Sequence, residues 1–156
     1  MRDYVWKNAD GLEVGFGRRD TENLEAGAIE VKGQVRQVEL EIYFNKDNTT
    51  ASVKNAVLPV GAVVSAATMY VREAFVGGTS VTIGTIKTDD TGAVTDNLVT
   101  PAAAVTANLT EGAVIVGAGG LVGETVADAL NITYATTGAF TAGRATLLVE
   151  YIHPSA

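Results

Sequence analysis

Apolar and polar residues alternate one by one along several segments of this chain, and this pattern constrains the fold more than any other feature. Between residues 38 and 44, apolar positions alternate with polar ones: Val38, Leu40, Ile42 and Phe44 against Glu39, Glu41 and Tyr43. Similar alternation recurs at 67–72, 81–85 and 130–134. A period of two is typical of a strand with one buried and one exposed face. Val, Thr and Ile supply 47 of the 156 residues, and β-branched side chains favour strands.

Turn-forming residues separate these segments at intervals of roughly ten residues, which is typical of a sandwich or barrel. We therefore predict an all-β fold: a single-domain antiparallel β-sandwich or jelly-roll-like body of about eight strands over residues 28–156. One short helix at most is expected, near residues 101–107, with Thr100 as its N-cap and Pro101 at its first position. The segment from Gly138 to Gly143 is predicted to be a turn.

Residues 1–27 differ from the rest and are predicted to form an N-terminal arm or hairpin. The stretch from Tyr4 to Gly17 predicts two short strands around an Asp10-Gly11 turn. Aromatic residues together with arginines are common anchors of protein interfaces. The arm therefore gives the candidate interface residues Tyr4, Trp6, Phe16, Arg18 and Arg19. An equally weighted alternative is that these rings cover one end of the protein's own core.

The residues that usually carry catalysis are scarce. The chain has no cysteine and one histidine, His153, so thiolate chemistry is excluded and a Ser-His-Asp triad is improbable. Glu39 and Glu41 alternate with core positions and predict a solvated face rather than an acid–base pair. Asp89 to Gly92 lacks the ligand pattern of a calcium loop and predicts a plain turn. We expect no enzyme activity, no metal site and no cofactor.

One glycine-rich segment invites comparison with a nucleotide-binding loop. Gly117, Gly119 and Gly123 follow a short apolar run in a Gly-x-Gly-x-x-x-Gly spacing, one residue longer than the dinucleotide-binding fingerprint. That fingerprint also needs a strand–helix–strand unit and an acidic residue about 20 positions later. The residues after Gly123 predict strands and lack this acid, so a glycine-rich connecting loop is the favoured interpretation.

The net charge of −7 makes nucleic acid an unfavourable partner because acidic chains repel phosphate backbones. The longest apolar stretch, Ala56 to Val64, is far shorter than a membrane helix requires. The first residues lack the apolar core of a signal peptide. We expect a soluble protein that is made in the cytoplasm and does not enter a membrane.

The segments from Leu58 to Val64, from Tyr70 to Gly84 and from Gly143 to Tyr151 resemble those of small β-rich virion proteins of tailed bacteriophages, of the head decoration or cement type. The resemblance covers roughly residues 56–85 and 128–152 and consists of strands and turns rather than a catalytic signature. It implies a structural protein on the outer surface of the phage capsid, made in the host cytoplasm. The implied partners are the major capsid protein and further copies of the chain, as a trimer or dimer.

Two other functions remain open. The same sandwich would suit a tail or fibre-attachment protein of a phage, present in few copies per particle. It would also suit a carbohydrate-binding adhesion module, for which Trp6 or Tyr70 would supply the aromatic platform.

Overall fold

The computed structural model describes residues 4–7, 13–16, 35–47, 49 and 57–153. The chain divides into two compact units, Met1–Val31 and Lys32–Ala156. In the first unit, β1 (Tyr4–Lys7) and β2 (Glu13–Phe16) pair antiparallel. The two strands predicted for this segment are therefore present, whereas the predicted Asp10-Gly11 turn lies outside the described residues.

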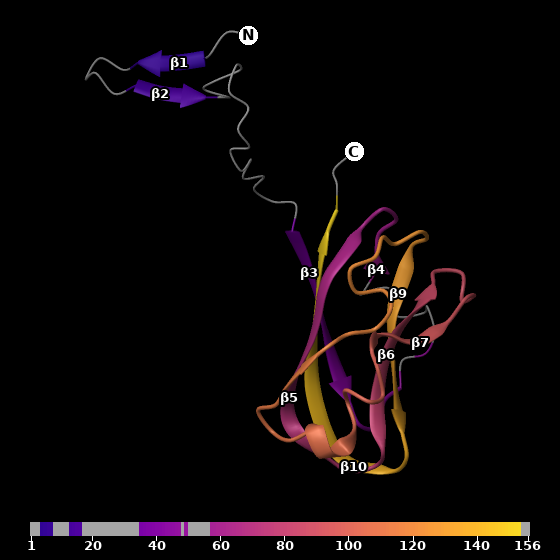
Figure 1. Cartoon of the computed structure of the whole chain (residues 1–156). Coiled ribbons are helices and arrows are strands. Elements are labelled where there is room, and N and C mark those ends of the chain that lie inside the picture. The colour runs from indigo at the N-terminus through magenta and orange to yellow at the C-terminus, as the bar shows by residue number, and fades with distance from the viewer. Residues whose placement is uncertain (1–3, 8–12, 17–34, 48, 50–56, 154–156) are drawn as a thin grey trace. The chain divides into compact units, whose positions relative to one another are not determined.

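The second unit, called the body below, consists of two four-stranded antiparallel sheets (Figure 1). Sheet 1 has the order β3-β10-β5-β8 and sheet 2 the order β4-β9-β6-β7. The strands of sheet 1 are β3 (Val35–Tyr43), β10 (Phe140–Ile152), β5 (Val63–Gly77) and β8 (Val114–Val116). Those of sheet 2 are β4 (Val57–Leu58), β9 (Leu130–Thr137), β6 (Ser80–Lys87) and β7 (Val94–Val99). This arrangement confirms the predicted all-β sandwich of about eight strands.

The core lies between the two sheets and is built from the apolar members of the alternating segments. Ile42, Met69 and Leu147 of sheet 1 are fully buried, as are Ile83 and Ile132 of sheet 2. Burying one such side chain stabilises a fold by roughly 1.5–3 kcal/mol. In sheet 1, polar members such as Glu39 and Arg72 are exposed, so the alternation in the sequence specifies which side of each strand faces inward. In sheet 2, the polar members Thr85, Asn131 and Thr133 are buried as well.

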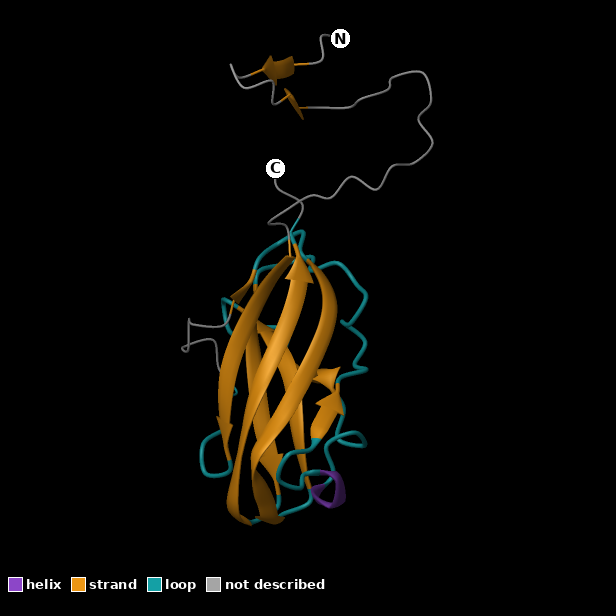
Figure 2. Ribbon diagram, turned by 90° about the vertical axis from the view of Figure 1, so that its left-hand side faces the viewer, coloured by secondary structure: helices purple, strands orange, loops and turns teal. Residues whose placement is uncertain are grey.

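The predicted helix near residues 101–107 is replaced by a hydrogen-bonded turn and a single turn of 3₁₀ helix, η1 (Thr106–Asn108). Figure 2 shows this turn in purple at one end of the body. The predicted capping residue does act at this place: the Thr100 hydroxyl oxygen accepts a hydrogen bond from the Ala103 N–H at 3.4 Å. Among the described residues, no helix is long and apolar enough to cross a membrane.

The turn predicted from Gly138 to Gly143 is shorter than expected, because β10 already begins at Phe140. Gly143 lies inside β10 with a φ of 141°, next to irregularities in the pairing with β5. A Cβ at Gly143 would overlap the ring of Phe75. Phe75 in turn packs edge-to-face on Phe140, with ring centroids 5.5 Å apart. Gly143 therefore makes room for a buried aromatic pair rather than forming a turn.

Candidate protein-interaction surface

The predicted interface residues fall into two groups. Tyr4 and Trp6 lie in β1 and Phe16 lies in β2, whereas Arg18 and Arg19 lie outside the described residues. In the register of the hairpin, Tyr4 is opposite Phe16 and Trp6 is opposite Val14. Since positions two apart in a strand share a face, these four positions occupy one face of the two-stranded sheet. The sequence analysis missed Val14, because a two-residue Asp10-Gly11 turn would place Trp6 opposite Gly15 rather than Val14.

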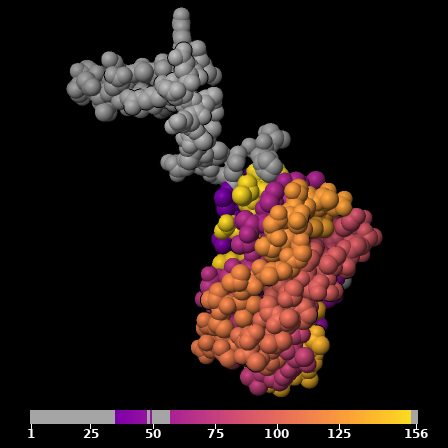
Figure 3. Space-filling model, viewed as in Figure 1, coloured from indigo at the N-terminus to yellow at the C-terminus, as the bar shows by residue number. Residues whose placement is uncertain are grey.

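The glycine-rich segment after β8 is a connecting loop and not the start of a helix, which confirms the interpretation favoured from the sequence. It binds both sheets through its backbone. Gly117 N–H donates to the carbonyl of Ala67 in β5 at 2.7 Å, and Gly119 N–H donates to the carbonyl of Leu98 in β7 at 3.2 Å. Figure 3 shows this part of the chain, in orange, lying across the surface of the body. The loop thereby closes one side of the sandwich.

Close approach explains why glycine occupies two of these positions. A Cβ at Gly119 would overlap the backbone of Asn97, and a Cβ at Gly117 would overlap the carbonyl oxygen of Leu98. By contrast, a Cβ at Gly120 would meet no atom within 4 Å. The spacing that resembles a phosphate-binding loop is thus explained by the contact of the loop with β7.

Beside this loop, β8 forms the edge of sheet 1 and exposes large apolar side chains. Val114 is opposite Tyr70 of β5, and Val116 is opposite Thr68. Their exposed fractions are 52% for Val114, 69% for Val116 and 38% for Tyr70. We call Tyr70, Val114 and Val116 the β8 patch. Clusters of exposed apolar side chains are typical of protein-binding surfaces.

The outer edge of β8 also offers backbone groups. The hydrogen bond from Gly117 to Ala67 sets which residues of β8 point their N–H and C=O groups toward β5. In an antiparallel ladder this direction alternates, so the polar backbone groups of Val114 and Val116 point away from β5. Within the described residues these groups form no ladder with another strand.

A shallow groove of about 510 Å³ runs along this edge. Its lining consists mainly of small apolar side chains: Ala103, Ala107, Asn108, Thr110, Ala113, Val114, Ile115 and Val116. The amide of Asn108 donates to the carbonyl of Ala103 at 3.1 Å, which holds that wall of the groove together. The groove, the patch and the free backbone groups together suit an extended peptide segment.

The outer face of sheet 1 carries a polar network on the side toward β3. The Thr146 hydroxyl donates to the Glu41 carboxylate at 2.7 Å and accepts from Arg72 Nε at 3.1 Å. Arg144 Nε lies 3.7 Å from the second Glu41 oxygen. Thr146 is buried by these side chains although it lies on the outer face. Thr146 of β10 therefore links Glu41 of β3 to Arg72 of β5, while Glu39 is exposed as predicted.

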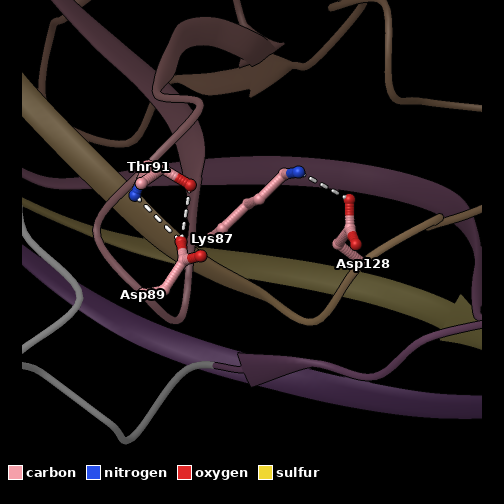
Figure 4. Close-up of polar contacts among 4 residues, drawn as sticks. All are labelled: Lys87, Asp89, Thr91 and Asp128. Atoms are coloured by element: carbon pink, nitrogen blue, oxygen red, sulfur yellow. Dashed lines mark hydrogen bonds and ion pairs between the residues drawn. The ribbon is translucent and has the colours of Figure 1, made fainter.

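The segment from Asp89 to Gly92 forms the predicted turn (Figure 4). Asp89 Oδ1 accepts hydrogen bonds from the Thr91 hydroxyl at 2.6 Å and from the Thr91 N–H at 3.1 Å. These bonds, the hydroxyl bond above all, hold the pKa of the Asp89 carboxyl below its ordinary value. The ion pair of Lys87 with Asp128, at 2.9 Å, raises the pKa of that lysine. The charged side chains of Asp89 and Lys87 therefore have their polar partners within or beside the turn.

Among the described residues, no cluster of three or more His, Cys, Asp or Glu side chains could hold a metal ion.

Three solved structures contain chains with a similar fold. One belongs to the acidic stable capsid structure of Helicobacter pylori bacteriophage KHP30, with 18% identity, a TM-score of 0.58, and coverage of 80% of this chain and 92% of that one. A chain in the cyanophage Pam1 capsid asymmetric unit has 20% identity, a TM-score of 0.53 and coverages of 86% and 95%. A chain in the capsid of Ralstonia phage GP4 has 15% identity, a TM-score of 0.53 and coverages of 81% and 89%. No family model and no curated protein matches the chain.

Proposed function

We propose that this chain is a structural virion protein of a tailed phage that binds the assembled capsid shell and reinforces it. Its partners are the major capsid protein and other copies of itself, as a trimer or dimer, and its place is the outer surface of the capsid. A protein that binds only the assembled shell stabilises that shell by mass action and needs no active site.

The observation that carries the proposal is the shared fold with chains of three phage capsid structures. The similarity spans most of both chains in each pair, so the matching chains are of comparable length. The β8 patch and its groove support a role in adhesion, because they expose apolar side chains beside backbone groups. They provide contact area without any catalytic group.

Purified particles and shells test the proposal directly. We expect the chain in virions in a copy number proportional to that of the major capsid protein. We also expect added protein to cosediment with shells assembled without it and to raise their thermal stability. Absence from particles would overturn the proposal, and a few copies per particle located at the tail would assign the chain to the tail or fibre alternative.

The carbohydrate-binding alternative has a separate test because Tyr70 is partly exposed beside Val114. A glycan array should show no specific binding by the full chain if adhesion is to protein. Specific glycan binding that is lost in Tyr70→Ala would favour the adhesion module.

The arm has its own test within this proposal. Tyr4, Trp6, Phe16, Arg18 and Arg19 are proposed to contact a protein partner. Deletion of residues 1–19 should leave the body folded and abolish shell binding or self-association. Unfolding of the body would instead show that the rings of the arm complete the core.

A further inference from the structure

We propose that the groove along β8 is the docking site for the β1–β2 hairpin of a second copy of this chain. The hairpin would extend sheet 1 at its β8 edge and cover the β8 patch. This inference deepens the proposed function and rests on its self-association. It names the surfaces through which copies meet.

The β8 edge of sheet 1, where the hairpin is proposed to dock, differs from the opposite edge, which is formed by β3. Val114 and Val116 are exposed, and their backbone groups point away from β5, next to a groove lined by small side chains. At the other edge, β3 carries Glu39 and Glu41. Charged residues on an edge strand discourage pairing with a further strand. The β8 edge lacks such protection within its three residues.

The donor segment needs a partner surface for physical reasons. The register places positions 4, 6, 14 and 16 on one face of the hairpin, and all four are large apolar residues: Tyr, Trp, Val and Phe. A two-stranded sheet alone is at best marginally stable in water, and a third strand or a packing surface is needed. Addition to β8 supplies the third strand, since the hairpin would gain a hydrogen-bonded neighbour at the edge of sheet 1.

The length of the connecting chain allows this exchange. Residues 17–34 join the hairpin to β3, and 18 residues can span at most roughly 60 Å. The longest strand of the body, β5, has 15 residues, which corresponds to about 50 Å at the usual rise. A hairpin can therefore reach the groove of a neighbouring copy that packs against its own body.

A second copy is the favoured occupant because each chain carries both halves of the contact. Passing the hairpin from one copy to the next satisfies every hairpin and every groove once the ring closes. Each added contact within a closed ring also strengthens the others. This exchange needs no partner of unknown sequence and gives the β8 edge and the two-stranded hairpin a neighbour in one interaction.

Sedimentation of the isolated full chain tests the proposal without any shell. We expect a dimer or trimer whose dissociation constant rises at least tenfold in Val116→Asp. The matched control is Val94→Asp, since Val94 is also an exposed valine, 46% accessible, but lies in sheet 2; it should associate like the parent. A chain that stays monomeric at every concentration, or association that Val116→Asp leaves unchanged, would overturn the proposal.

A second measurement shows whether docking occurs between chains. Because the chain has no cysteine, Val5→Cys and Glu111→Cys each provide one labelling site, the first on the opposite face of the hairpin from Trp6 and the second shortly before β8. Mixing separately labelled chains should give energy transfer between them. Transfer within a doubly labelled chain at dilution, with none between chains, would show docking on the same chain and refute the exchange.

These results are distinct from the test of the proposed function. An isolated chain that associates through β8 but is absent from particles would refute the virion role and keep the exchange. A chain that reinforces shells while it stays monomeric would support the virion role and refute the exchange of hairpins between copies.

Discussion

Gly119 and Gly120 are neighbours in the loop after β8, but their surroundings are opposite. Gly119 lies against the backbone of Asn97, whereas Gly120 faces open space. We expect Gly119→Ala to lower the free energy of unfolding by about 1–3 kcal/mol, because the added methyl group forces the loop away from β7. Gly120→Ala is the control and should change it by less than about 0.5 kcal/mol. Urea unfolding measures both, and equal effects would contradict the packing described for this loop.

The turn after β6 offers a test by titration. The Thr91 hydroxyl is the main cause of the lowered pKa of the Asp89 carboxyl. In Thr91→Val the pKa of Asp89 should rise toward its ordinary value of 3.8, measured by carbon NMR of the carboxyl group. Thr95→Val in β7 is the control and should leave that pKa unchanged. A pKa of Asp89 that is the same in Thr91→Val as in the parent would refute the role of the hydroxyl.

The sign of the accompanying stability effect follows from the direction of the shift. A carboxyl whose pKa is lowered by folding stabilises the protein at pH values above its ordinary pKa. That contribution is lost as the pH falls through the lowered pKa. The turn should therefore weaken only in acid below about pH 4, and less so in Thr91→Val.

For single residues, the sequence predicts those features that depend on neighbouring residues in the chain. Alternation identified Ile42, Ile83 and Ile132 as inward-facing, and Thr100 was recognised as a capping residue. It did not explain Gly143, because the reason for that glycine is the ring of Phe75, 68 positions earlier in the chain. A contact between distant segments leaves no mark in the neighbouring residues.

Among elements, β3, β10 and β5 are linked on their outer face through Thr146. Thr146→Val removes the hydrogen bonds to Glu41 and Arg72, and we expect it to lower the free energy of unfolding by about 1–2 kcal/mol. Thr68→Val is the matched control, since Thr68 lies two residues along β5 from Tyr70, the partner of Thr146, and therefore on the same face. This control should be neutral or slightly stabilising, because valine favours strands. Denaturant unfolding compares the two, and an equal loss in both would refute the linking role of Thr146.

The strands themselves were predictable to different degrees. The long alternating segments became β3, β5 and β9, because their periodicity extends over several residues. The exposed edge formed by β8 was not predictable, since three residues carry too little periodicity and the groove depends on residues 103–110 packing beside it. The register of β1 with β2 was not available from the predicted hairpin, because a two-residue Asp10-Gly11 turn pairs Trp6 with Gly15, one residue away from the observed partner Val14.

For the whole molecule, the boundary between arm and body stays a prediction that truncation can test. Among the residues whose burial the structure describes, which all lie in Lys32–Ala156, the core of the body is complete enough to include Ile42, Ile83 and Leu147 at 0% exposure. We expect a chain of residues 32–156 to unfold cooperatively at the same urea midpoint as the full chain, at concentrations where the full chain is monomeric. Circular dichroism measures this midpoint. A midpoint lowered by truncation would show that the arm contributes to the core of its own body.

The position of β10 has a consequence for how the protein is made. β10 (Phe140–Ile152) lies between β3 and β5, so a central strand of this sheet is synthesised after both of its neighbours. Until β10 is made, β3 and β5 lack the neighbour that joins them, and their hydrogen-bonding edges stay open. Assembly of sheet 1 therefore awaits the emergence of β10 from the ribosome. Termination of translation before β10 would leave an aggregation-prone fragment rather than a slightly shorter protein.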